Sequence, residues 1–366
     1  MLPHCQLLGL LLLMHISVFA MNAGDTVKSP LTLGLQFQTG FIIPHSDELK
    51  FATESQVWGW QLDVSKVLNS QKSWDNCNCY SKLGLSFNYY NYDNPEVLGN
   101  SYNLVLFAEP YFGFKSRTYL TLRGGMGVTY LDQVYDAETN PSNTFYSSPI
   151  SFILLIQLKL NYRLSDLWNV YLGGNYNHIS NGGARKPNRG MNFPTIGIGV
   201  DYALRQGILP QRDKTTSILK KRLVKYARAF FTMRSETDTL ERNEIKSFLI
   251  GVEGGVLKGL TNVNAILLGG EFSYDGLYDE LNDVYGTNYH PFIGSLHIGH
   301  AFVFGRFSFT QQFAWYAIKS YPFNDNDFFQ RYAVFWQFGK KLNIGFSLKA
   351  HGHVAENMDV RIGATF

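Results

Sequence analysis

Apolar and polar residues alternate along most of the chain from about residue 29 to the C-terminus. Residues 82–89, 120–130, 156–163 and 343–351 each carry apolar side chains at every second position, with polar residues or glycine between them. Successive side chains of a strand point to opposite faces, so a period of two predicts strands with one apolar and one polar face. We therefore expect an all-β protein.

A soluble β-sandwich and a transmembrane β-barrel both alternate in this way, but only the barrel turns its apolar face to lipid. The recurrence of the pattern over most of the chain favours the barrel. The last segment also does so, because it places Met358, Val360, Ile362 and Ala364 on one face and ends on Phe366. A final aromatic strand is typical of outer-membrane proteins. The predicted fold is a transmembrane antiparallel β-barrel of the outer-membrane type.

Loop lengths indicate the orientation, because periplasmic turns of such barrels are short and outer loops are long. Residues 115–117 and 164–166 look like periplasmic turns, and residues 136–147 and 181–191 look like outer loops. If Tyr226–Met233, which lies in a charged stretch, is a strand, the barrel has about sixteen strands; if it is a periplasmic helix, about fourteen. The expected division is a leader at 1–20, barrel strands at 29–205, a charged linker or extra strand at 206–245, and further barrel strands at 246–366.

Composition agrees with a membrane barrel. Aromatic residues make up 15% of the chain and charged residues 17%, with 34 glycines, whereas soluble domains average about 25% charged residues. Leu7–Leu13 and the small residues that follow predict a secretory signal peptide, cleaved after residue 20 or as late as residue 23. The alternatives are a buried strand or a short membrane anchor. No later apolar run reaches the ~18 residues of a membrane helix, so we expect an exported protein of the cell outer membrane.

Three cysteines and the net charge say little about function. Cys5 lies in the leader, and Cys77 and Cys79 form a C-x-C in an expected turn, which lacks the second ligand pair of most metal sites. His351 and His353 share a face but have no evident third ligand, so no metal and no cofactor is predicted. A net charge of +3 without a basic cluster gives no reason to expect nucleic acid as a partner.

The candidate chemistry lies in residues 175–194. His178 and Ser180 are two residues apart on a predicted strand, which places their Cα atoms roughly 6.6–6.8 Å apart on one face. An imidazole can bridge that distance to a hydroxyl and activate it as a nucleophile. Both residues have the parity of Val170, so they should face lipid near the outer end of the strand. For an isolated H-x-S motif the alternative is that the histidine and the serine are inert and lie at the level of the lipid headgroups.

The residues around this pair favour a site over an inert pair. Asn181-Gly182-Gly183 follows Ser180 directly, and its backbone N–H groups could face an oxyanion. Pro187-Asn188-Arg189-Gly190 predicts a turn that could aim the Asn188 amide at the same place. A polar pair on the lipid-facing wall is explained if the substrate is itself a membrane lipid.

On the H-x-S-N-G run His178–Gly182 and the P-N-x-G run Pro187–Gly190, the sequence resembles the lipid A 3-O-deacylase family, whose relatives include acyloxyacyl hydrolases. The strands at about 29–205 fit the family's eight-stranded barrel. The resemblance implies that Ser180 is the nucleophile and His178 the general base. It also implies that Asn188, with a backbone N–H near Gly182, stabilises the oxyanion, and that lipid A of lipopolysaccharide is the substrate.

One position departs from the family pattern. The acid that orients the histidine falls on Asn192, an amide that can hold the imidazole tautomer but cannot stabilise an imidazolium by charge. The parity of Glu109 and Asp201 points them into the lumen, so neither is a good replacement. An inactive relative remains an alternative.

The other charged residues have two expected roles. Arg185, Lys186 and Arg189 lie in the same loop and could hold lipid phosphates by charge-assisted hydrogen bonds, or be ordinary solvated charges. A second set should pair inside the barrel as structure: Glu109, Arg123, Lys159, Glu253, Glu271, Lys349 and Arg361.

Three functions therefore compete. The first is an outer-membrane serine esterase that removes an ester-linked acyl chain from lipid A. The second is a channel, because a barrel of about sixteen strands leaves a pore whereas one of about eight is filled. The third is a structural barrel with a vestigial hydrolase site.

Overall fold

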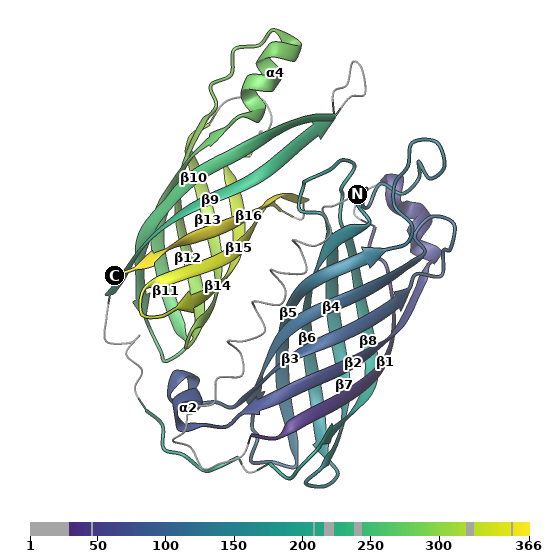
Figure 1. Cartoon of the computed structure of the whole chain (residues 1–366), viewed down its shortest axis with the longest axis vertical. Coiled ribbons are helices and arrows are strands. Elements are labelled where there is room, and N and C mark those ends of the chain that lie inside the picture. Colours follow the sequence, from purple (N-terminus) through teal and green to yellow (C-terminus); the bar gives the residue numbers. More distant parts are fainter. Residues whose placement is uncertain are drawn as a thin grey trace, which may run out of the picture.

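The computed structural model describes residues 29–44, 47–207, 209–215, 223–237, 244–319, 326–352 and 354–366. The predicted leader at 1–20 and His353 lie outside these residues. Within them, sixteen antiparallel strands close into two separate barrels of eight (Figure 1). The described helices are all short, and none of them is long and apolar enough to cross a bilayer.

The first barrel is built from β1 (Leu31–Phe41), β2 (Gln56–Leu68), β3 (Ser81–Asn91), β4 (Asn100–Phe112), β5 (Thr118–Leu131), β6 (Ile150–Arg163), β7 (Trp168–Ser180) and β8 (Met191–Ala203). The second is built from β9 (Leu223–Thr237), β10 (Glu244–Gly259), β11 (Asn264–Asp275), β12 (Phe292–Phe304), β13 (Phe307–Ile318), β14 (Phe328–Phe338), β15 (Leu342–His351) and β16 (Val354–Thr365). Short helices precede β2, β3 and β12: η1 (Asp47–Glu54), α2 (Gln71–Cys77) and α4 (Leu277–Tyr285).

The barrel class and the higher strand count are as predicted, but the strands do not form one cylinder. β8 turns back to pair with β1, for example Gly34 with Asp201, and β16 pairs with β9, for example Ile362 with Ala229. Once β1 and β8 have satisfied each other's backbone groups, neither offers an edge to a ninth strand. β9 contains Tyr226–Met233, the segment for which a strand and a helix were both open.

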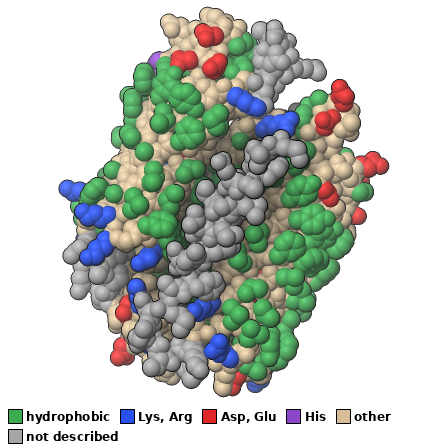
Figure 2. All heavy atoms as spheres, viewed as in Figure 1, with side chains coloured by type: hydrophobic (Ala, Val, Ile, Leu, Met, Phe, Trp, Pro, Cys, Tyr) green, Lys and Arg blue, Asp and Glu red, His purple; other side chains and the backbone are tan. Residues whose placement is uncertain are grey.

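Both barrels turn apolar side chains outward and polar ones inward. β6 exposes Ile156 and Leu158 and buries Gln157 and Lys159, as the alternation predicted. Figure 2 shows hydrophobic side chains over much of the outer wall of the first barrel. A wall with this polarity is stable only where its outer surface meets hydrocarbon.

The two lumens are filled by separate networks of ion pairs. In the first barrel Glu109 meets Arg123 at 2.7 Å and Lys159 at 3.2 Å, while Lys82 pairs with Asp201. In the second barrel the corresponding acids are Glu253, Glu271 and Asp359, which pair with Arg228, Arg331 and Arg361. The predicted pairing of lumenal charges is confirmed, with one network in each barrel.

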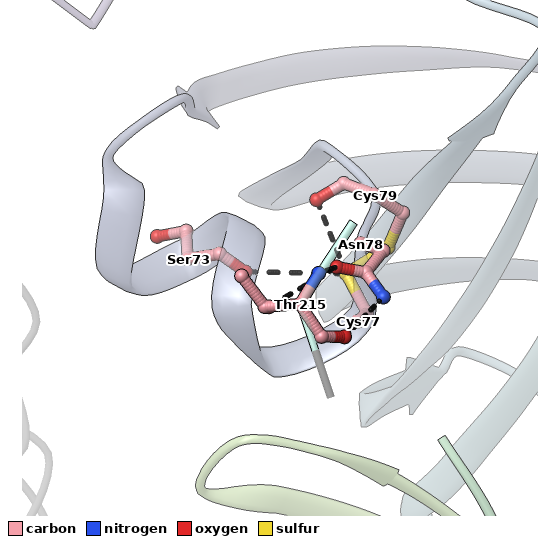
Figure 3. Close-up of a disulfide and its surroundings, with 5 residues drawn as sticks. All are labelled: Ser73, Cys77, Asn78, Cys79 and Thr215. Atoms are coloured by element: carbon pink, nitrogen blue, oxygen red, sulfur yellow. Dashed lines mark hydrogen bonds between the residues drawn. A yellow bond between two sulfur atoms is a disulfide. The ribbon is translucent and has the colours of Figure 1, made fainter. Parts of the chain in front are cut away.

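Most of the short turns of both barrels lie at one end, here called the inner end, and most of the long loops lie at the other, the outer end. At the inner end a disulfide joins Cys77, the last residue of α2, to Cys79, with 5.0 Å between their Cα atoms (Figure 3). Asn78, between them, donates from Nδ2 to the Thr215 carbonyl at 2.9 Å and accepts the Thr215 N–H at 2.9 Å. Trp74 of α2 donates to the Asp213 carbonyl. Together these contacts fasten the segment between β8 and β9 to the first barrel.

Candidate active site

His178 and Ser180 end β7 at the outer end of the first barrel. β7 exposes Leu172 and Tyr176 and buries Asn175 and Asn177 in the lumen. Because side chains alternate along a strand, His178 and Ser180 continue the outward series, as their parity predicted. His178 is partly buried, and Ser180, although it points outward, is only 3% exposed.

The side chain of Asn192 holds the imidazole of His178. The two residues face each other across the β7–β8 ladder, and His178 Nδ1 lies 2.7 Å from Asn192 Oδ1. An amide oxygen only accepts, so this contact assigns the ring proton to Nδ1 and leaves Nε2 as the basic nitrogen. The backbone of Asn192 is itself held, because the backbone carbonyl of this residue accepts a hydrogen bond from the Ile43 N–H at 2.8 Å.

Two donors from the loop converge on the hydroxyl of Ser180. Asn188 Nδ2 lies 2.9 Å from Ser180 Oγ, and the Gly182 N–H lies 3.1 Å from it. The Asn188 amide is oriented by the Asn181 N–H, which donates to Asn188 Oδ1 at 3.1 Å. When Ser180 Oγ attacks an ester, negative charge develops on the carbonyl oxygen, which is bonded to the attacked carbon. These two donors therefore lie next to the place where an oxyanion would form.

Gly190 connects the two sets of contacts. It has a φ of 71°, and a Cβ at this position would lie 2.8 Å from His178 Cε1. Its N–H donates to the Phe145 carbonyl at 2.9 Å, and Phe145 packs with Tyr146, Ile179 and other residues in an apolar core beneath the loop. Burial raises the pKa of the Tyr146 phenol well above its ordinary value, so that group stays neutral there.

The three basic residues of the loop differ in their surroundings. The side chains of Arg185 and Arg189 are exposed, and Lys186 Nζ lies 3.7 Å from Glu236 Oε2 of the second barrel. Arg185 contributes through its carbonyl, which accepts from Asn181 Nδ2 at 2.7 Å. Their suggested role in binding phosphate stays a prediction.

A surface cavity of about 670 Å³ lies on the same wall, beyond Asn192. Outward residues of β8, Pro194 and Ile196, line one side, and Phe41 of β1 and Glu54 of η1 line the other. Pro194 follows Asn192 at the next outward position of β8. The cavity is thus reached from the catalytic candidates along a single strand.

Two closed antiparallel barrels with apolar outer walls define an outer-membrane β-barrel protein. Residues 58–201 match the family model described as lipid A 3-O-deacylase (PagL), and residues 224–366 match the model described as acyloxyacyl hydrolase, C-terminal domain. The chain therefore belongs to the lipid A 3-O-deacylase and acyloxyacyl hydrolase family.

Solved structures with a similar arrangement of strands are distant in sequence. Neisserial surface protein A is 10% identical, with a TM-score of 0.33, and the match covers 47% of this chain and 96% of that one. The outer membrane enzyme PagL is 12% identical, with a TM-score of 0.29 and coverage of 45% and 97%. The search of curated proteins found no match.

Sequence reasoning named Ser180, His178, Asn192, Asn188 and Gly182, and it missed the parts that hold them. The sequence marked Gly190 only as the glycine of the P-N-x-G run. It did not indicate the positive φ of this residue or its closeness to His178. The contacts of this loop with the second barrel carried no sequence signal, because the partners are single residues fifty or more positions away.

Proposed function

We propose that this protein is an outer-membrane serine esterase that removes an ester-linked acyl chain from lipid A of lipopolysaccharide. The observation that carries the proposal is the convergence of Asn188 Nδ2 and the Gly182 N–H on Ser180 Oγ. Beside it, on the same outward face, His178 is held by Asn192. Membership of the family supports the class of substrate.

In the proposed first step, Ser180 Oγ forms a bond to the acyl carbon while His178 Nε2 takes the hydroxyl proton. The carbonyl electrons move to oxygen, and the Asn188 amide and the Gly182 N–H stabilise that charge. The intermediate collapses, the bond from the acyl carbon to the sugar oxygen breaks, and His178 returns its proton to that oxygen. Water then attacks the acyl-serine with the same assistance, which releases the fatty acid and restores Ser180.

The position of the site supports a lipid substrate. An outward site at the outer end of the barrel lies where the sugar and acyl parts of an outer-leaflet lipid meet. The cavity lined by Phe41, Pro194 and Ile196 offers apolar surface to an acyl chain. Exposed Arg185 and Arg189 suit the phosphates of lipid A.

We expect Ser180→Ala and His178→Ala to lower lipid A deacylation by more than about 10³-fold, because nucleophile and base act as a unit. The full chain and each variant would be purified in detergent and incubated with lipid A, and products would be read by mass spectrometry. Ser142→Ala, an exposed serine of the neighbouring outer loop, is the matched control and should retain activity. Unchanged deacylation by Ser180→Ala would overturn the proposal.

A further inference from the structure

The seam between β9 and β16 is paired only along its inner half. The two strands pair from Val360–Phe231 to Thr365–Tyr226, but β9 continues outward to Thr237 and β16 begins at Val354. The outer halves of these strands therefore lack each other as ladder partners. Unpaired backbone groups at such an edge need another partner.

The loop of the first barrel that carries the catalytic candidates occupies this half of the seam. The Met358 N–H of β16 donates to the Gly182 carbonyl at 3.0 Å, and Ser235 Oγ of β9 donates to the Gly183 carbonyl at 3.2 Å. Figure 1 shows the outer end of β16 pointing toward the outer loops of the first barrel. The second barrel thus binds both glycine carbonyls that follow Ser180.

The fit at the two glycines leaves no room for a side chain. Gly182 and Gly183 have φ values of 71° and 83°. A Cβ on Gly182 would lie 3.0 Å from Met358 Cβ, and one on Gly183 would lie 2.7 Å from the Glu356 carbonyl oxygen. Glycine adopts these φ values without strain, but it also leaves a free loop with many conformations.

The partner side of the contact is itself rigid. Glu356 is the extra residue of a bulge in β16, and its carboxylate lies 3.0 Å from Lys349 and 3.2 Å from Arg234. Bulges re-aim a strand locally. The ion pairs fix this one where β16 meets the glycines.

We propose that the second barrel is a working part of the active site, and that Ser235 is a positioning residue for the oxyanion hole. By holding the carbonyls of Gly182 and Gly183, β9 and β16 fix the backbone whose Gly182 N–H lies 3.1 Å from Ser180 Oγ. The inference rests on the proposed esterase function and extends it to a barrel that contains neither nucleophile nor base. A small displacement of such a donor lowers the stabilisation of the transition state more than the stabilisation of the bound substrate.

The test is steady-state deacylation of lipid A by the full chain and its variants in detergent. Ser235→Ala should lower kcat about tenfold with KM within about twofold, since misplacing a catalytic group by about 1 Å costs up to about 10²-fold. Ser235→Thr keeps the hydroxyl and should restore kcat. The control is Ser247→Ala. Ser247 pairs with Arg234 on the neighbouring strand but faces the lumen, so the kcat of this variant should match that of the unmodified protein.

Gly183→Ala gives a second, stronger perturbation, and we expect it to lower kcat about 100-fold. Its control is Gly286→Ala, which has a φ of 63° but open space around the new Cβ. Circular dichroism and heat-dependent gel mobility would verify that each variant is folded.

Normal kcat in Ser235→Ala and Gly183→Ala, or no rescue by Ser235→Thr, would overturn this inference. Deacylation that Ser180→Ala abolishes would in that case leave the esterase proposal standing. Absence of any Ser180-dependent deacylation by the full chain would overturn both.

Discussion

At the scale of single residues, Asn192 decides how strong the proposed catalyst is. Its amide oxygen holds His178 Nδ1 at 2.7 Å, so it orients the ring as a carboxylate would. It carries no charge, and it therefore cannot stabilise the imidazolium that forms when His178 takes the serine proton. The proposed esterase should therefore be slow, because its histidine is well oriented but no charge stabilises the imidazolium.

We expect Asn192→Asp to raise kcat by at least about tenfold, because the isosteric carboxylate adds charge at the same contact; the reverse change in a serine protease lowers kcat by about 10⁴-fold. Asn192→Leu, which removes the acceptor, should lower kcat below that of the unmodified protein. Initial rates of lipid A deacylation measure both. A kcat for Asn192→Asp no higher than that of the native chain would contradict this account.

At the scale of elements, the β7–β8 loop joins the base to the oxyanion donors. Asn188 reaches Ser180 from one part of the loop, and Gly190 lies against the His178 ring from another. The loop is supported from below by the apolar core around Phe145 and from the side by the second barrel. Its shape, more than the sequence spacing of its residues, brings the groups together.

Gly190→Ala should reduce kcat more than about tenfold, because the added Cβ would lie 2.8 Å from His178 Cε1 and push the ring from its position. Gly113→Ala is the control: its φ of 73° imposes the same backbone strain, but nothing lies within 4 Å of the new Cβ. Both variants would be compared for kcat and for thermal unfolding. Equal kcat for the two would show that His178 tolerates the displacement.

The strands and the outward direction of His178 and Ser180 were predictable because a period of two is a local property of the sequence. The closure into two barrels was not, because alternation does not tell which edges pair. The Asn192 contact followed from the family motif, and the register of β7 and β8 supplies its geometry. The role of Ser235 could not be predicted, because its hydrogen bond to the Gly183 carbonyl depends on how two closed barrels lie against each other.

At the scale of the whole molecule, two filled barrels replace the wide pore that sixteen strands could enclose. Barrels of about eight strands have room only for their own side chains. Arg123, Lys159 and Glu109 are at most 1% exposed in the first lumen, and Arg361 and Glu253 are at most 2% exposed in the second. These buried charged side chains fill the two lumens, which argues against the channel hypothesis.

We therefore expect no steady ion current when the purified protein is reconstituted in planar bilayers. The ion pairs that fill each lumen would have to separate in a low-dielectric interior before ions could pass. An outer-membrane porin would serve as the positive control for insertion and recording. Large, stable conductance steps from this protein would contradict the filled-lumen interpretation.

The return of β8 to β1 has a consequence for how the chain can be divided. Cleavage of the segment between β8 and β9 would break none of the described strand ladders, since each cylinder is complete by itself. Contacts between the two cylinders, among them the glycine contact and the Lys186–Glu236 ion pair at the outer end, would then hold the halves together. Such a design is modular in its strand pairing: a second cylinder can be exchanged without rebuilding the ladders of the first, but the surface that holds the glycine loop must be matched.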